Sequence, residues 1–333
     1  MKQTINSKTS VKMTMKTVAV YAAAGIGMLT VIIFIIVFLY GSLGTPKTVF
    51  AALVDTSIYA KEQPLIVDYT KVSGNVDLVD FPMLVKIMSD ELKSIANGGY
   101  VESNLGYDIV FADNVGNQLN HQIESYDPAT GEYVAWVSVP VISASIDTEI
   151  KIHFGDATAI SNPSVTNVWN PYYQAVWHME NDPSGSSPQL IDGTTNARHG
   201  TAFGNMSTAD LVAGKIGPAL ELDGTDDYFK ITGYKGVTDK TERTVSLWFK
   251  TDRSAYTHSF VSWGKNKPGK AYDVYMDSNN NVFGIGNNGG QKNGSVNIAD
   301  DSWHYLVVVL PPSSAPFVQD HLLYVDGVLE TVS

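Results

Sequence analysis

The sequence predicts an all-β protein, built as two antiparallel β-sandwiches behind an N-terminal transmembrane helix. First, residues 18–40 form 23 consecutive residues without a charge. Second, the later apolar segments are short, rich in β-branched and aromatic residues, and separated by turn residues, which is typical of antiparallel sandwiches. Third, strand and helix patterns do not alternate along the chain, and this disfavours a nucleotide-binding α/β fold.

The uncharged N-terminal run is long enough for a membrane anchor. As a helix it would measure about 35 Å, and the hydrocarbon layer of a bilayer is ~30 Å thick. The residues before it include four lysines and no acidic residue. Basic residues beside a first hydrophobic segment tend to remain in the cytoplasm. We therefore predict a basic cytoplasmic tail over 1–17, a single-pass anchor over 18–41, and extracytoplasmic C-terminal domains at the cell membrane.

A cleavable signal peptide is the alternative for this segment. Residues 49–51 offer small side chains at the alternating positions that signal peptidase accepts, so a secreted form would be cut near Ala51. Against this, the apolar run exceeds the ~7–15 residues usual for a signal peptide. Both alternatives export the same C-terminal domains.

Charge and cysteine content narrow the classes of partner. The chain has 34 acidic and 22 basic side chains and a net charge of −12. Affinity for nucleic acid depends on clustered Lys and Arg, so we expect no nucleic-acid partner. The absence of cysteine from the sequence excludes disulfides and thiolate metal sites.

The chain after the anchor divides into a linker and two predicted domains. Gly41, Gly44 and Pro46 end the helix, so residues 42–60 are expected to form the linker. The remaining residues are numerous enough to bury two cores. We place the first domain at 61–170 and the second at 171–333.

The first domain is predicted to be a sandwich with a single short helix. Ser89 can cap a two-turn helix over 90–96, because acidic residues follow it and glycines at 98 and 99 stop it. A hairpin loop is predicted over 127–131. The expected strands are 107–111, 121–126, 133–139 and 148–154.

The second domain has equally clear strand signals. Residues 244–250 alternate apolar and polar side chains, with Trp248 as an aromatic residue on the polar face. Residues 303–310 are apolar on both faces and are expected to form a central strand. The Asp-Gly pair at 326–327 predicts a two-residue hairpin turn.

Six ordered segments of the first domain form a recognisable set. They are FPMLVK (81–86), YDIVFAD (107–113), GNQLNHQIE (116–124), YDPATG (126–131), AWVSVP (135–140) and IHFG (152–155). In these segments the first domain resembles the domain of unknown function 2341, which is found in prokaryotic surface proteins. The resemblance covers roughly 61–170 and gives a placement rather than an activity.

The second domain also contains six ordered segments that form a recognisable set. They are AVWHME (175–180), DGTTNARHG (192–200), GPALELDGTDDY (217–228), TVSLWF (244–249), DSWHY (301–305) and LYVDG (323–327). In these segments the second domain resembles a laminin-G-like, concanavalin A-like jelly roll. Related domains continue beyond the last hairpin with further strands, so the resemblance implies a jelly roll that is truncated at its C-terminus here.

Three carboxylates gather on one turn of this second domain. They belong to Asp223, Asp226 and Asp227, and Ca²⁺ prefers such oxygen ligands. The resemblance implies a cation at one rim of the sandwich, which makes these residues candidate Ca²⁺ ligands. The alternative is a solvated turn whose aspartates accept hydrogen bonds from neighbouring backbone amides.

Two tryptophans are candidates for carbohydrate binding. Trp248 is predicted to project from the polar face of its strand, and Trp263 lies near the following loop. Aromatic rings offer a large apolar area to the C–H face of a pyranose. The alternative role for both residues is packing in a core or between sheets.

Catalysis is not expected. Glu221 and Asp223 resemble part of the E-x-D-x-x-E run of laminarinase-type glycoside hydrolases, but Asp226 stands where the last Glu belongs. Retaining hydrolysis needs two carboxyl groups ~5.5 Å apart in defined roles. Because the fold alone does not imply an activity, we predict that the protein is not an enzyme.

The sequence therefore predicts a membrane-anchored surface protein with a lectin-like, non-catalytic module. This module would bind a glycan or a surface protein, helped by Ca²⁺. One alternative is a structural envelope or appendage subunit that associates with copies of itself. Another is a part of a polysaccharide-processing enzyme whose catalytic module lies outside this chain.

Overall fold

The computed structural model describes residues 53–331, except 160, 164–165, 239–240, 254–256, 266, 268–269, 279–281, 287–289 and 313–316. Within this part the protein is all-β, and all pairings between its strands are antiparallel. Its helices are short 3₁₀ turns, and none is long and apolar enough to span a bilayer. The predicted tail over 1–17, the anchor over 18–41 and the cleavage position near Ala51 lie outside the described residues.

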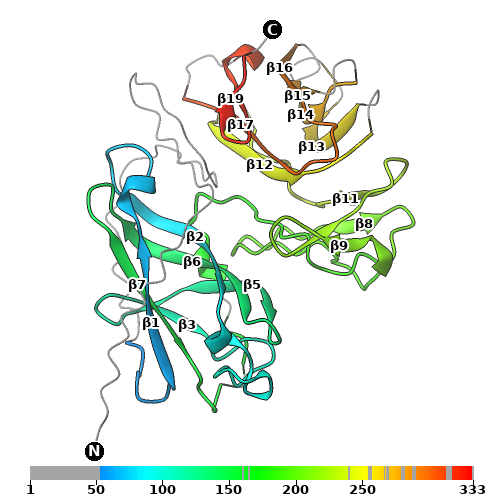
Figure 1. The fold of residues 1–333 in the computed structure, drawn as a ribbon. Helices are drawn as coiled ribbons and strands as arrows, with labels where there is room; N and C mark the ends of the chain where they lie inside the picture. The colour runs from blue at the N-terminus through cyan, green and yellow to red at the C-terminus, as the bar shows by residue number, and fades with distance from the viewer. Residues whose placement is uncertain are drawn as a thin grey trace, which may run out of the picture. The chain divides into compact units, whose positions relative to one another are not determined.

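The described chain forms two compact units (Figure 1). The first contains residues 53–178 and 192–197, and the second contains 179–191 and 198–331. Residues 171–178 and 192–197, which we expected in the second domain, therefore pack with the first unit. The chain passes between the units three times, after 178, 191 and 197.

The first unit contains two antiparallel sheets, as predicted for a sandwich. Phe111 of one sheet lies 5.3 Å from the His121 ring and 6.2 Å from the Tyr133 ring of the other, measured between centroids, so the sheets face each other. One sheet has the order β1 (Lys61–Val67), β7 (Thr148–Phe154), β3 (Val110–Asp113), β4 (Gln118–Leu119). The other has the order β2 (Leu78–Met88), β6 (Glu132–Ile142), β5 (His121–Asp127).

The helix predicted over 90–96 is wrong in type. Two 3₁₀ turns occupy this segment, η2 (Asp90–Leu92) and η3 (Ile95–Asn97). Ser89 caps the first turn as expected, accepting a 3.2 Å hydrogen bond from the N–H of Glu91. The helix cannot continue because the N–H of Ser94 donates to the Pro128 carbonyl and Ser94 bridges to Val101. Tertiary pairing has replaced the local helical pattern.

The second unit contains two four-stranded sheets and two two-stranded ribbons. The first sheet has the order β12 (Arg243–Phe249), β17 (His304–Leu310), β18 (Leu322–Val325), β19 (Val328–Leu329). The second has the order β13 (His258–Gly264), β14 (Ala271–Met276), β15 (Val282–Gly286), β16 (Gln291–Asn297). The ribbons pair β8 (Thr201–Phe203) with β11 (Tyr228–Lys230), and β9 (Leu211–Ala213) with β10 (Pro218–Leu220).

The core of the second unit confirms the predicted strand faces. Alternate residues of β14, β15, β17 and β18 form one buried cluster, against which Val245, Leu247 and Phe249 pack. β17 is central between β12 and β18, as its apolar pattern predicted. Residues 326–327 form the predicted turn between β18 and β19, with positive φ at both positions. Local sequence signals therefore determined this part of the unit.

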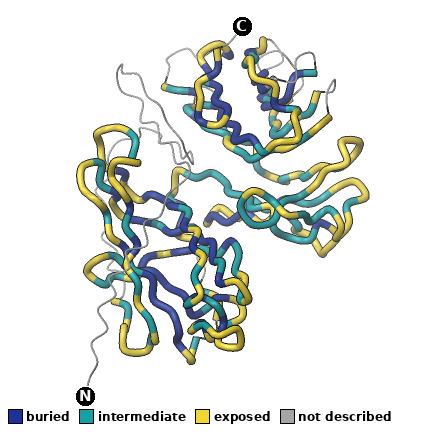
Figure 2. Tube along the Cα trace, in the orientation of Figure 1, coloured by how far each residue is buried: buried dark blue, intermediate teal, exposed yellow. Residues whose placement is uncertain are grey.

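The ribbons form a lightly packed part of the second unit (Figure 2). Among the described residues from 201 to 242 none is buried, whereas β14, β15, β17 and β18 are largely buried. The acidic turn at 223–227 lies between β10 and β11, on this exposed part of the chain.

Candidate functional site

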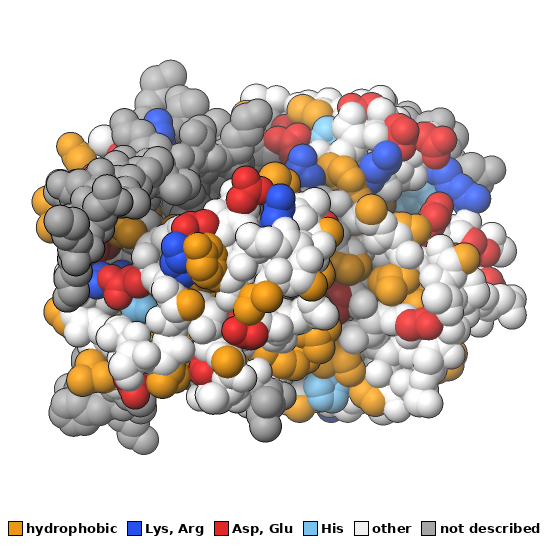
Figure 3. Space-filling view, turned by 60° about the horizontal axis from the view of Figure 1, so that its bottom comes forward, with side chains coloured by type: hydrophobic (Ala, Val, Ile, Leu, Met, Phe, Trp, Pro, Cys, Tyr) orange, Lys and Arg blue, Asp and Glu red, His pale blue; other side chains and the backbone are white. Residues whose placement is uncertain are grey.

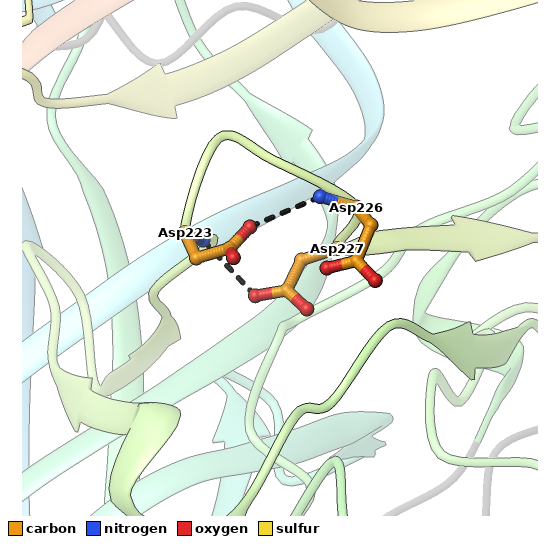
Figure 4. Close-up of side chains that lie close together, drawn as sticks. All are labelled: Asp223, Asp226 and Asp227. Atoms are coloured by element: carbon orange, nitrogen blue, oxygen red, sulfur yellow. Dashed lines mark hydrogen bonds between the residues drawn. The ribbon is translucent and has the colours of Figure 1, made fainter.

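The three aspartates of the acidic turn lie close together (Figure 4). One carboxylate oxygen from each of Asp223, Asp226 and Asp227 lies within 4.8 Å of the others. Asp223 and Asp226 are exposed and Asp227 is partly exposed. The turn therefore brings together the three residues that the sequence singled out for Ca²⁺.

Backbone amides already use part of this donor set. The Oδ1 atom of Asp223 accepts hydrogen bonds from the N–H groups of Thr225 at 2.7 Å and Asp226 at 3.2 Å. The N–H of Asp223 donates to Oδ2 of Asp227 at 3.0 Å. The hydrogen bond from the Thr225 amide is the main cause of the lowered pKa of Asp223. These contacts are those of the solvated-turn alternative, and they keep the carboxylate of Asp223 ionised.

The remaining oxygens fit a hard cation only in part. Ca²⁺ takes 6–8 oxygen ligands, and the turn offers the carboxylate oxygens that do not accept backbone hydrogen bonds. A cationic side chain also lies nearby, because a Cβ built on Gly224 would collide with the Arg253 guanidinium. The residues suit a partly hydrated divalent ion at the surface better than a closed protein cage.

Trp248 lies on the face of β12 that points away from the main core. Its ring centroid is 5.2 Å from that of Tyr305, and it packs with the buried cluster of Tyr305, Val307 and Tyr324. The ammonium group of Lys215 lies over the indole at 5.5 Å. Trp248 is partly exposed, whereas its neighbours Tyr305, Val307 and Tyr324 on this face are buried.

Trp263 packs against the main core of the second unit. Its ring stacks on Tyr272 with centroids 4.3 Å apart and an interplanar angle of 14°. A Cβ built on Gly236 would overlap the indole, so the loop containing Gly236 lies against it. Trp248 and Trp263 belong to different clusters, and the structure does not bring them together into one stacking platform.

A groove that sequence reasoning missed lies on the sheet β13–β16. It is open to solvent, has a volume of about 490 Å³, and is lined by two glycines and five residues with polar side-chain groups. These side chains belong to Thr257, Asp273, Tyr275, Asp277 and Gln291. Tyr272, Val274 and Met276 of β14 face the core, so Asp273 and Tyr275 must face away from it. Alternation along β14 was the sequence signal for this surface, although it did not indicate a groove.

A buried polar cluster in the first unit was also missed. Oε2 of Glu124 accepts hydrogen bonds from Trp136 Nε1 at 2.9 Å and from His178 Nδ1 at 2.6 Å. Oε1 of Gln122 lies 3.1 Å from His178 Nε2 and accepts from Trp169 Nε1 at 2.8 Å. Because both imidazole nitrogens face acceptors, the arrangement suits the imidazolium form of His178.

This cluster depends on an irregularity in β5. The pairing of β5 with β6 shifts between Ile123 and Ser125, which leaves Glu124 as the extra residue of a bulge. A bulge redirects a side chain, and here the carboxylate reaches an ion pair whose side chains are only 3% and 7% exposed. A Cβ built on Gly193 would crowd His178 and Gln122, so residue 193 closes the cluster. The contacts fasten residues 166–178 and 192–194 to the first unit.

Charges of both signs are mixed on the face drawn in Figure 3. Lysine and arginine side chains there are interspersed with aspartate and glutamate among the described residues. No single basic patch dominates the described side chains of this face.

Comparison with family models matches two segments of the chain. Residues 105–182 match the model described as a domain of unknown function (DUF2341). Residues 223–333 match the laminin-G-type model described as the concanavalin A-like lectin/glucanases superfamily. Comparisons with curated proteins and with solved structures gave no match. Two family models therefore match the chain in the predicted order, the DUF2341 model first and the concanavalin A-like lectin/glucanase model second.

Proposed function

We propose that this protein is a membrane-anchored prokaryotic cell-surface protein whose second unit binds a glycan without catalysis. The observation that favours this function most is the polar groove on an open sheet face within the segment that matches lectins and glucanases. Carbohydrate sites need side chains that accept hydrogen bonds from hydroxyl groups and donate hydrogen bonds to them, and the groove supplies two carboxylates, an amide and two hydroxyls. The first unit would act as a spacer between the membrane and this module.

The cell-surface part of the proposal depends on the N-terminal sequence. The uncharged run at 18–40 and the lysines before it favour a single-pass anchor with the second unit outside the cell. Cells expressing the full chain should retain it in the membrane after a carbonate wash. A shortened, soluble product beginning near residue 52 would favour the secreted alternative.

The non-catalytic part depends on the carboxylates. Glu221 and Asp223 lie on an exposed stretch, and the Asp223 carboxylate accepts two backbone hydrogen bonds. A retaining hydrolase needs a nucleophile and an acid facing one substrate bond. Incubation of the full chain with soluble β-glucans should therefore release no reducing sugar, and release above the level of an Asp223→Asn variant would contradict this.

We further propose that the acidic turn binds Ca²⁺ and helps to order the rim of the module. Asp223, Asp226 and Asp227 would supply the protein oxygens, and water would complete the shell. Adding Ca²⁺ should raise the thermal stability of the full chain. This rise should disappear in Asp226→Asn, and Asp252→Asn serves as an exposed control of the same charge change. Equal responses of the three proteins would contradict a calcium site on this turn.

Glycan binding is tested with the full-length protein in detergent micelles on an array of neutral, amino and acidic saccharides. We expect binding that Thr257→Ala and Gln291→Ala weaken, because both side chains line the groove. Trp248→Ala tests sugar stacking at the partly exposed indole. Trp263→Ala should instead destabilise the second unit, because the ring packs on Tyr272.

The alternative outcome of this experiment is self-assembly. If the protein forms ordered arrays and retains no saccharide, the hypothesis of a structural subunit replaces that of a glycan-binding protein. Loss of binding in EDTA would connect the acidic turn to glycan recognition, whereas unchanged binding would separate the two.

A further inference from the structure

The described lining of the groove on the sheet β13–β16 is acidic, although several lysines lie close to it in the sequence. Among its described lining residues, the ionisable carboxyl side chains are those of Asp273, which is partly buried, and Asp277, which is buried, and the other polar groups are neutral. No lysine or arginine belongs to the described lining. Lys292 of β16 is buried and donates to the carbonyls of Gln319 at 2.7 Å and His321 at 2.6 Å.

The floor of the groove is fixed by close packing. The ring of Tyr275 lies against Gly284 and Gly286 of the neighbouring strand, where a Cβ would approach it to 3.1 Å and 3.3 Å. The hydroxyl of Tyr275 donates to Oδ1 of Asn293 at 2.8 Å. The Tyr275 ring cannot move without losing these contacts, so it forms a fixed part of the groove.

Asp273 is a partly buried acceptor. The hydroxyl of Ser259 donates a hydrogen bond to its Oδ1 atom. Burial raises the pKa of Asp273, and the hydrogen bond from Ser259 opposes this rise only in part. A positively charged ligand group would relieve the cost of keeping this carboxylate ionised away from water. An anionic ligand group would increase that cost.

We infer that the groove selects saccharides bearing free amino groups, which pair with Asp273 and Asp277, over N-acetylated and acidic saccharides. The inference rests on the proposed glycan-binding function and specifies its ligand class. Carboxylates accept but do not donate hydrogen bonds, so an ammonium group satisfies them and forms a charge-assisted bond. The carboxylate of a uronic acid would be repelled by the two aspartates. An N-acetylated sugar has no positive charge to pair with them.

The test compares three probes against the full-length protein in detergent micelles. The probes are glucosamine oligomers, the same oligomers after N-acetylation, and oligogalacturonides. Binding is measured near pH 6, which is below the pKa of ~7.7–8 typical of α-amino groups, so that the amines of the probe are charged. We expect glucosamine oligomers to bind about tenfold tighter than their N-acetylated forms, the change that one charged hydrogen bond provides.

Variants connect this preference to the groove. Asp273→Asn should lower the affinity for glucosamine oligomers towards that of the N-acetylated probe, and Asp252→Asn should leave the preference unchanged. Gln291→Lys places a cation at an exposed position of the lining and should reverse the order of glucosamine oligomers and oligogalacturonides. This second variant keeps the test informative if Asp273→Asn fails to fold.

The outcomes separate the two levels of the proposal. Equal affinity for the amino and N-acetylated probes, or an unchanged preference in Gln291→Lys, would overturn the amino-sugar inference while glycan binding stands. Failure of every saccharide on the array to bind would overturn the proposed function itself.

Discussion

The carboxylate of Asp108 accepts a hydrogen bond from the backbone N–H of Gly155 across 47 residues of sequence, at 3.1 Å. The same side chain accepts from the N–H groups of Glu102 at 2.7 Å and Ser103 at 3.0 Å. Asp108 is fully buried. One carboxylate therefore joins the loop before β3 to the end of β7. β3 itself begins at Val110, three residues after the predicted start at 107.

Replacing Asp108 with asparagine should destabilise the first unit by about 2–4 kcal/mol, because a buried acceptor of three N–H groups becomes partly a donor. The change is measured as the shift of the unfolding transition, assigned to the first unit by hydrogen exchange in β1 to β7. Asp127→Asn is the matched control, since Asp127 accepts from Ala129 on an exposed hairpin. A loss no larger than that of the control would show that Asp108 is dispensable.

Glu124→Gln should cost more than the same substitution at a surface ion pair. Glu124 forms a buried pair with His178, and removal of one partner of such a pair costs about 3–5 kcal/mol. Glu132 pairs with Lys86 at 2.9 Å where both side chains are substantially exposed, so Glu132→Gln should cost about 0–1 kcal/mol. Urea unfolding of both variants measures the difference, and equal midpoints would refute the buried ion pair.

Much of the fold was predictable because its signals are local. The alternation in 244–250 fixed which residues of β12 face the core, and the Asp-Gly pair at 326–327 fixed the last hairpin. A strand that is apolar on both faces has one natural place, the centre of a sheet, and β17 occupies it. These features depend on the pleat and on turn geometry rather than on distant partners.

The features that were missed depend on distant partners. The helix expected over 90–96 is interrupted because Ser94 pairs with Pro128 and Val101. Local sequence patterns do not predict these two contacts. The bulge at Glu124 leaves no mark in the sequence, although it creates the cluster with His178. The sequence around Trp263 is compatible with an exposed ring or with a packed ring. The structure shows that the ring stacks on Tyr272.

The stability of the second unit should fall as the pH rises above about 6.5, because His304 gains its partners in the folded state. Burial alone would lower the pKa of His304, but hydrogen bonds to Asp326 and Asp300 outweigh it, so the folded pKa is raised. The stabilisation is therefore complete below the unfolded pKa and is lost as the pH passes the folded one. His304→Gln should flatten this dependence in thermal unfolding between about pH 6 and about pH 9. Identical slopes for the variant and the parent protein would exclude the role of His304.

Substitution of two glycines in one loop can distinguish the cost of backbone strain from the cost of overpacking Trp263. Gly233 and Gly236 both have positive φ, 87° and 71°, so alanine at either position costs about 1–2 kcal/mol of backbone strain. A Cβ at Gly233 meets nothing within 4 Å, whereas a Cβ at Gly236 overlaps the indole of Trp263. Gly236→Ala should therefore destabilise the second unit by about 1–3 kcal/mol more than Gly233→Ala, because the added carbon overpacks the site. Urea unfolding followed by tryptophan fluorescence measures both variants, and combining each with Trp263→Ala should abolish the difference. If the difference persisted without the indole, the cost at Gly236 would arise from the backbone, and the loop would not lie against Trp263 in solution.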